Sequence, residues 1–401
     1  MAVREDSGER AGVAQAARDP LEAQPHARAV LGPVLAPGGR PSHAYLFHGP
    51  AGSGKRAAAR AFAAALLADG ARNPETVAER VARESHPDLT WARPSGASEM
   101  LVADIEEPVV AAAARTPFES RRRVFVIEGA ETMNDQAANR LLKTLEEPPA
   151  FTHLVLLAER REDVLATIAS RCQPVRFDPL PADRLASLLR GADRAGGPDE
   201  RANDDFDEEA DRVLACARLA LGDAGVAARL ASAEGAALRE RAEAFARWAL
   251  AGEHGARPWL GLLEAAREAG AAAGELAQRE TQAEAELLPG KERKRHEREG
   301  AEAQRRGERR ARTRTLDLGL RLLELWLRDL LCIGEDAEEL VYAVDRRGQL
   351  RADAEGRAPG ALRRALELVA DTRLSLSVNV SEELALEALA YRLQATFAGR
   401  A

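Results

Sequence analysis

Short apolar runs alternate with helical stretches along the first half of the chain. Three β-prone runs, His43–His48, Val124–Ile127 and Leu154–Leu157, are bounded by charged residues or glycine, as is typical of buried parallel strands. The Ala-rich stretch Arg56–Ala68 follows the first run and predicts a helix. Strands that alternate with helices over about 160 residues indicate an α/β domain with a parallel sheet.

The second half of the chain is expected to be helical. Strand signals almost vanish after Pro179-Leu180-Pro181, and the acidic stretch Gly196–Asp211 predicts a loop. Leucines recur every three or four residues from Leu316 to Leu331 and predict a helix with one apolar face. A last helix is expected after Ser381, an N-cap residue type that two glutamates follow.

These changes in pattern divide the chain into four segments. We expect a mobile tail at residues 1–20, the α/β domain at 21–178, a small helical unit at 179–236 and a larger helical domain at 237–401. A charged, basic insertion at about 285–314 interrupts the last of these.

Composition narrows the class of protein. The 401 residues include 57 basic and 65 acidic side chains, with a net charge of −8 and 45% hydrophobic residues. These values argue against a wholly disordered chain and against a strongly basic DNA-coating protein. No run approaches the roughly 18 to 20 apolar residues that span a bilayer, and the opening residues lack the apolar core of a signal peptide. We therefore expect a soluble cytoplasmic protein.

The cysteines and one charged segment are the remaining candidates for binding chemistry. Cys172, Cys216 and Cys332 stand singly, so they indicate neither a disulfide framework nor a zinc site. Lys291–Arg314 holds eleven basic residues against five glutamates. Mixed runs of this kind usually form a solvated helix or a disordered insertion, and contact with DNA or a protein partner is the alternative.

The clearest motif lies between the first predicted strand and the helix after it. Glycines there let backbone N–H groups converge on a phosphate, the helix N-terminus adds positive potential, and a lysine neutralises further charge. This phosphate-binding loop consists of Gly49, Pro50, Ala51, Gly52, Ser53, Gly54 and Lys55, followed by Arg56. A Gly-rich turn that binds nothing is the alternative.

Two positions depart from a site that hydrolyses ATP. Arg56 stands where the motif requires the Ser or Thr hydroxyl that holds Mg²⁺. The second strand ends in Glu128-Gly129, whereas an active ATPase ends it with a pair of acidic residues. Glu128 is then either an outer-shell metal ligand or a solvated carboxylate. Binding and hydrolysis are therefore separable here, and no direct metal ligand is predicted.

Two further segments end helices. The run Ala138–Pro148 predicts an amphipathic helix that stops near Glu147, because a proline follows. The run Thr167–Cys172 predicts a helix end with a surface arginine, Arg171, and a buried thiol. Neither segment indicates a function by itself.

Taken together, the motifs resemble the bacterial clamp-loader branch of the AAA+ family of P-loop ATPases. The resemblance is specific over about residues 24–177 and weaker towards the C-terminus. It implies an AAA+ P-loop domain, a helical lid at 179–236 and a helical collar at 237–401. The segments that carry it are His43–Phe47, Gly49–Lys55, Ala138–Pro148 and Ser170–Cys172.

The resemblance also implies partners. In that family five subunits form an open ring that loads the sliding clamp onto primed DNA during replication by DNA polymerase III. The expected partners are the motor subunits, the delta subunit, the clamp through the assembly, and primer-template DNA, at the replisome in the cytoplasm. The Ser-Arg-Cys arginine acts on ATP held by a neighbouring subunit, so Arg171 is the candidate arginine finger.

Four departures from the family's motor subunits agree with one another. Besides Arg56 and Gly129, Ala158-Glu159 stands where a hydroxyl residue senses the γ-phosphate, and Gly225 stands where a second sensing arginine would lie. The motor subunits bind zinc through four cysteines, and none occurs between Arg56 and Arg171, so no zinc is expected.

The resemblance therefore implies an accessory subunit that completes the ring without hydrolysing ATP. ATP or ADP would be possible at its degenerate loop. Two alternatives stay open: an active ATPase subunit that uses Lys55 and Glu128, and a DNA-binding module dominated by the basic insertion.

Overall fold

The computed structural model describes residues 20–36, 38–94, 99–193, 203–252, 257–285, 289–376 and 380–398. The predicted tail lies outside them, apart from residue 20. The described residues form two units: one contains residues up to 193 together with 221–226, and the other contains 203–220 and 227–398. The expected division into ATPase domain, lid and collar stays a prediction.

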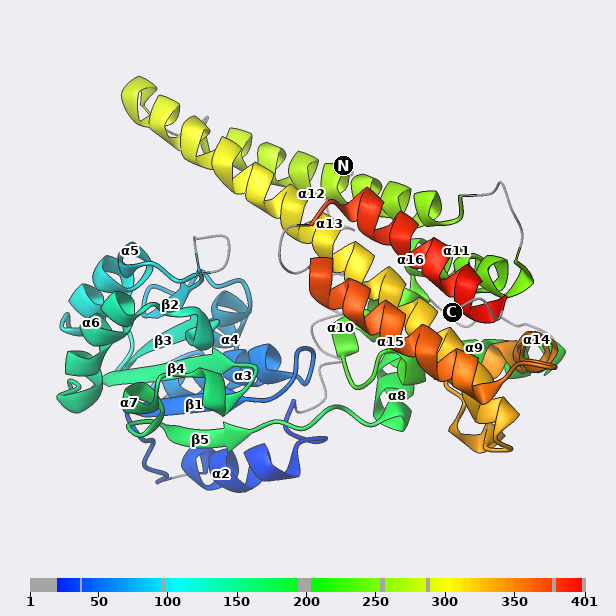
Figure 1. Ribbon diagram of the computed structural model, residues 1–401. Coiled ribbons are helices and arrows are strands. Elements are labelled where there is room, and N and C mark those ends of the chain that lie inside the picture. The colour runs from blue at the N-terminus through cyan, green and yellow to red at the C-terminus, as the bar shows by residue number, and fades with distance from the viewer. Residues whose placement is uncertain are drawn as a thin grey trace, which may run out of the picture. The chain divides into compact units, whose positions relative to one another are not determined.

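A five-stranded parallel sheet forms the centre of the first unit (Figure 1). The strands lie in the order β2-β3-β4-β1-β5, and every neighbouring pair is parallel. The predicted α/β fold is therefore confirmed, and its three predicted strands correspond to β1, β3 and β4. The strands are β1 (Ala44–His48), β2 (Leu89–Ala92), β3 (Arg123–Glu128), β4 (Thr152–Ala158) and β5 (Gln173–Arg176).

Helices cover both faces of this sheet. Successive side chains of a strand point to opposite faces, so the apolar strands contribute to two cores, and each core is covered by helices. In β1, Ala44 and Leu46 join the core under α5, α6 and α7, while Tyr45 and Phe47 join the core under α2, α3 and α4. The helices of the unit are α2 (Pro25–Leu35), α3 (Lys55–Leu67), α4 (Pro74–Ala82), α5 (Val102–Ile105), α6 (Asp135–Glu146), α7 (Ala166–Ala169) and α8 (Ala182–Asp193).

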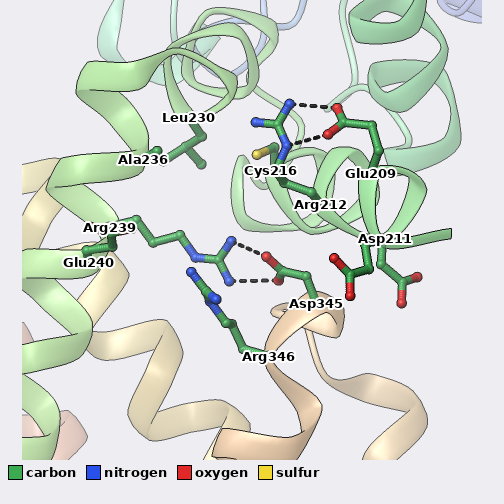
Figure 2. A pocket seen from close by; sticks show the side chains of 11 residues that line it. Glu209, Asp211, Arg212, Cys216, Leu230, Ala236, Arg239, Glu240, Asp345 and Arg346 are labelled. Atoms are coloured by element: carbon green, nitrogen blue, oxygen red, sulfur yellow. Dashed lines mark hydrogen bonds and ion pairs between the residues drawn. The ribbon is translucent and has the colours of Figure 1, made fainter. Parts of the chain in front are cut away.

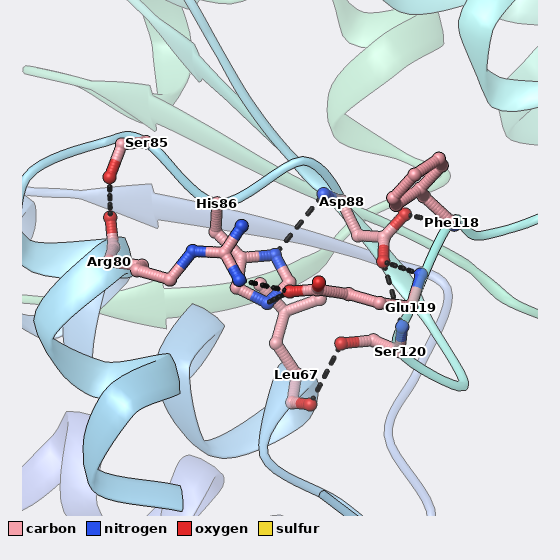
Figure 3. Close-up of polar contacts among 8 residues, drawn as sticks. All are labelled: Leu67, Arg80, Ser85, His86, Asp88, Phe118, Glu119 and Ser120. Carbon is pink, nitrogen blue, oxygen red and sulfur yellow. Dashed lines mark hydrogen bonds and ion pairs between the residues drawn. The ribbon is translucent and has the colours of Figure 1, made fainter. Parts of the chain in front are cut away.

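One buried carboxylate holds the turn that precedes β3 (Figure 3). Asp88 accepts hydrogen bonds from the backbone N–H groups of Phe118, Glu119 and Ser120 at 2.6 to 2.9 Å. His86, also buried, lies with Nε2 3.1 Å from a carboxylate oxygen of Glu119. Hydrogen bonds to an ionised acceptor are strong, so this cluster fixes the start of β3, whose other end carries Glu128.

The second unit is built from helices joined by turns within its described residues. The loop predicted for Gly196–Asp211 is wrong from residue 203 onward, because α9 begins at Asn203. Acidic residues are stabilised in the first turns of a helix by its dipole, which accounts for the acidic composition there. The helices are α9 (Asn203–Leu219), α10 (Ala224–Ala231), α11 (Ala233–Ala251), α12 (Trp259–Ala285), α13 (Gly290–Gly334), α14 (Arg347–Ala354), α15 (Pro359–Leu376) and α16 (Glu382–Phe397).

The 45-residue helix α13 contains both the predicted leucine-rich helix and most of the basic segment. Leu320, Leu323 and Leu327 are fully buried, which confirms the apolar face. The helix expected at Ser381 is also confirmed as α16, although the Ser381 side chain makes no capping hydrogen bond. None of the helices among the described residues is long and apolar enough to cross a membrane.

Candidate functional site

The phosphate-binding loop lies at the carboxyl edge of the sheet, between β1 and α3. Gly52 and Gly54 have φ angles of +68° and +91°, a left-handed conformation that glycine adopts without strain. Helix α3 begins at Lys55, so its N-terminal N–H groups and its dipole face the loop, as in phosphate-binding sites. The strand–loop–helix context predicted from the sequence is therefore present.

Lys55 turns back onto its own loop. Its Nζ donates hydrogen bonds to the carbonyl oxygens of Gly49 and Pro50, the latter at 2.7 Å. Burial lowers the pKa of Lys55, and the charges of Glu159 and Glu131 oppose that shift. Burial in turn raises the pKa of Glu131. The lysine is thus already engaged by oxygen atoms of this chain.

A carboxylate also lies directly against the loop. A Cβ atom at Gly52 would collide with the side chain of Asp223, and the backbone N–H of Ala224 donates to Gly52 O at 3.2 Å. Asp223 accepts from the N–H groups of Gly225 and Val226 at 2.8 and 3.0 Å, so it caps α10. Its negative charge beside the loop opposes a bound phosphate anion in this arrangement.

Arg56, at the position of the missing hydroxyl, forms an ion pair with Glu128. The indole N–H of Trp91 donates to Glu128 Oε2 at 3.1 Å, and Arg93 Nε lies 3.4 Å from the same oxygen. The Glu128 side chain is only 16% exposed. It is therefore not a solvated carboxylate, because three donors from this chain surround it.

These residues do not fit a magnesium ion. A guanidinium already neutralises Glu128, the carboxylate at the end of β3, and Arg56 stands where the hydroxyl that would bind the metal is required. Their fit to a nucleotide phosphate is mixed. The hydroxyl of Ser53 is buried without a hydrogen-bond partner among the described residues, which favours a bound group, whereas Asp223 opposes an anion.

Sequence reasoning did not single out Trp91, Arg93 or Asp223 as parts of this site. Trp91 belongs to β2, which was not predicted, and pairs in register with Val126 of β3. Recognition of that strand would have placed Trp91 and Arg93 near the end of β3. Asp223 lies two residues before Gly225, which the resemblance had placed at the position of a phosphate-sensing arginine. That signal marked the segment, but not the contact of the Asp223 carboxylate with Gly52, which joins residues far apart in the sequence.

Arg171 lies in a separate place, just after α7. Its Nη2 donates to Glu146 Oε1 at 2.7 Å and its Nη1 donates to Thr167 O at 2.9 Å. The side chain is 38% exposed, while the neighbouring Cys172 is buried and burial raises the pKa of its thiol to about 12. The fold thus joins the two helix-end motifs, because Glu146 ends α6.

Arg171 and the phosphate loop occupy opposite edges of the sheet. In the parallel pairing of β1 with β5, Gln173 lies beside Tyr45 and Arg176 lies beside His48. Arg171 precedes β5 and so lies at the amino edge, whereas the loop follows β1 at the carboxyl edge. Three residue steps of strand, about 10 Å, separate the Gln173–Tyr45 pair at the start of β5 from the Arg176–His48 pair next to the loop. The guanidinium of Arg171 also bonds to Glu146, which lies at the amino edge.

A cavity of about 690 Å³ lies within the second unit (Figure 2). Arg239 donates two hydrogen bonds of 2.8 Å to Asp345, and Arg212 pairs with Glu209. Small-molecule pockets are mostly apolar with a few polar groups, whereas charged residues bonded to one another line much of this cavity. We assign it no ligand.

Comparison with known proteins gives a family match for part of the chain. Residues 30–181 match a family described as DNA polymerase III, delta subunit. DNA polymerase III subunit delta' from Pseudomonas aeruginosa is 40% identical over 166 residues, which are 40% of this chain and 49% of that protein. The delta' subunit from Bacillus subtilis is 39% identical over 156 residues, 37% of this chain and 46% of that protein.

A gamma/tau subunit of DNA polymerase III is also similar. The protein from Mycobacterium bovis is 36% identical over 171 residues, which are 41% of this chain and 29% of that protein. The chain thus spans about half the length of the delta' relatives and less of the gamma/tau relative.

Proposed function

We propose, from the premise that residues 30–181 belong to the DNA polymerase III delta-subunit family, that this chain is an accessory clamp-loader subunit of the delta' type. The resemblance expected from the sequence is confirmed for that segment. In the proposed role the chain completes a ring with motor subunits and a delta subunit, which loads the sliding clamp onto primed DNA. A cytoplasmic, replisome-associated location follows from that role.

The ion pair between Arg56 and Glu128 is the observation that carries the accessory role. Hydrolysis at a P-loop needs Mg²⁺ beside the β- and γ-phosphates and a carboxylate that orients water or metal. Here Arg56, which stands at the position of the metal-binding hydroxyl, forms an ion pair with Glu128, which stands at the position of that carboxylate. ATP or ADP would then bind weakly, without hydrolysis and with little dependence on Mg²⁺.

The place of Arg171 supports action on a neighbour. Its guanidinium is exposed at the edge of the sheet opposite to its own loop. An arginine finger stabilises charge that develops on the transferred phosphoryl group, and Arg171 would supply this to ATP held by an adjacent motor subunit. The contact with Glu146 is an exposed ion pair, which costs little to break when a triphosphate replaces the carboxylate.

ATP turnover by the reconstituted loader tests this role. With Arg171→Ala we expect turnover to fall about 10²-fold or more, as for other fingers supplied in trans. Arg160→Ala is the matched control, because Arg160 is also exposed and paired with a carboxylate, Asp163. Equal turnover by the Arg171→Ala loader and the unmodified loader would contradict the finger role.

A second candidate is hydrolysis at the chain's own loop. The intact run Gly49–Lys55 and the likeness to a gamma/tau subunit favour it. ATP turnover by the isolated chain that is lost in Lys55→Ala would support this candidate against the accessory role.

A further inference from the structure

The basic segment forms one arm of a long helical hairpin. Helices α12 and α13 run antiparallel, and their far end extends beyond α11, α15 and α16 of the same unit (Figure 1). Glycines on both arms let the helices approach closely: a Cβ atom at Gly300 would meet Thr281, and one at Gly274 would meet Glu308. The basic segment is therefore part of a supported helix.

Basic side chains outnumber acidic ones among the exposed, described residues of this arm. Glu308 turns towards α12, where it contacts Gly274 and accepts a hydrogen bond from Gln304 at 2.9 Å. Arg298, Arg305 and Arg309 are exposed. These arginines are seven and four residues apart, so they lie on one face of the helix. Glu302 is also exposed and lies on this face between Arg298 and Arg305, so the face carries one described carboxylate against three guanidinium groups.

The three outward arginines have no partner among the described residues: none of their guanidinium groups forms a hydrogen bond or an ion pair there. Arg312, which lies nearer to α12, is paired with Glu382 of α16, and Arg306 lies 3.8 Å from Glu302. Arg298, Arg305 and Arg309 thus present exposed positive charge that no described residue neutralises, and we call them the α13 stripe.

We propose that the α13 stripe binds the phosphate backbone of duplex DNA. Eleven residue steps separate Arg298 from Arg309, about 17 Å at 1.5 Å per step, and over that length a duplex presents about ten phosphates. Arginine pairs with phosphate oxygens through its planar fork of donors. The contact would be independent of base sequence, because only backbone charge is recognised.

The composition of the arm favours a duplex over other polyanions. From Gly290 to Arg314 the helix contains no Phe, Tyr or Trp and no large aliphatic residue. Single-stranded DNA is bound by stacking of bases on such aromatic side chains, and protein interfaces are centred on aromatic and arginine anchors buried in well-packed pockets. The arginines of the stripe are exposed and have no apolar residues of this segment around them, so charge alone remains for recognition.

Fluorescence anisotropy of a labelled 30-base-pair duplex with the full chain tests the proposal. In the triple variant Arg298→Gln, Arg305→Gln, Arg309→Gln, we expect the slope of log K against log salt to become shallower by about 3, since each lost phosphate contact removes about 0.9. The dissociation constant near 100 mM salt should rise about ten-fold or more. Circular dichroism checks that the helix content is unchanged.

A second triple variant controls for net charge. Arg72, Arg83 and Arg115 are exposed and unpaired among the described residues, and their change to Gln removes the same charge from the sheet-containing unit. We expect the slope of the unmodified chain. Glu302→Gln removes a carboxylate next to the stripe and should instead tighten binding, by about two-fold.

Three results would each overturn the proposal. The first is a stripe variant that binds with the affinity and slope of the unmodified chain. The second is a control variant that weakens binding as much as the stripe variant does. The third is an unmodified chain that fails to bind the duplex at 50 mM salt, which would leave an acidic protein as the occupant. The measurement uses the chain without its ring partners, so its failure is independent of the clamp-loader role.

Discussion

At the scale of single residues, the pairing of Arg56 with Glu128 carries the proposed accessory role. Arg56 stands where the loop motif requires a hydroxyl, and its guanidinium pairs with Glu128 at the end of β3. Trp91 and Arg93 hold the same carboxylate from the side of β2. In the proposed role, this positive charge takes the place of a metal ion.

The sequence predicted this departure only in part. The loop motif alone shows that a hydroxyl is missing at position 56, since the motif has Ser or Thr there. The pairing with Glu128 was not, because a linear pattern does not tell which strand ends lie next to a loop. Asp223 was missed for the same reason: its contact with Gly52 crosses most of the α/β unit's chain length.

Nucleotide titration with and without Mg²⁺ tests the residue-scale claim. The unmodified chain should bind ATP with nearly the same affinity in both conditions. Arg56→Thr restores a hydroxyl and frees Glu128, so its affinity should increase about ten-fold when Mg²⁺ is added. Arg72→Thr is the control, because Arg72 is exposed in the same unit and unpaired among the described residues, whereas Arg60 on α3 lies over the ring of Trp91. An unmodified chain with strong Mg²⁺ dependence would refute the claim that Arg56 displaces the metal.

At the scale of elements, the sequence predicted the long helices and the strands with an uninterrupted apolar run. The long leucine period of α13 and the apolar cores of β1, β3 and β4 were predictable, because each gives a repeated signal over several residues. The strands β2 and β5 were missed. Each has four residues, and β5 contains Pro174 and lies at the sheet edge, where alternation is weak and proline is tolerated.

Truncation of the α13 core tests the element assignment. Leu323 is fully buried, so Leu323→Ala should lower the free energy of unfolding by about 2 to 5 kcal/mol in urea denaturation, from lost burial and the cavity left behind. Leu384 on α16 is 64% exposed, and Leu384→Ala should change stability by less than about 0.5 kcal/mol. Similar costs for the two variants would show that the buried face was assigned wrongly.

At the scale of the whole molecule, the parallel sheet keeps two candidate sites of the first unit apart. Loops that follow strands gather at its carboxyl edge with the phosphate-binding motif, and segments that precede strands gather at its amino edge with Arg171 and Glu146. The order of motifs along the chain does not reveal this separation, which depends on every strand pair being parallel. The finger role itself came from the resemblance, because an exposed arginine after a short helix has no chemical signature of its own.

Clamp loading onto primed DNA, by rings reconstituted with either Lys55→Ala or Arg171→Ala in this subunit, tests the central claim most directly. If the chain's own loop does not hydrolyse ATP, as proposed, Lys55→Ala should load clamps at the unmodified rate. It predicts that Arg171→Ala slows loading about ten-fold or more. Full-rate loading with Arg171→Ala, or loss of loading with Lys55→Ala, would contradict it.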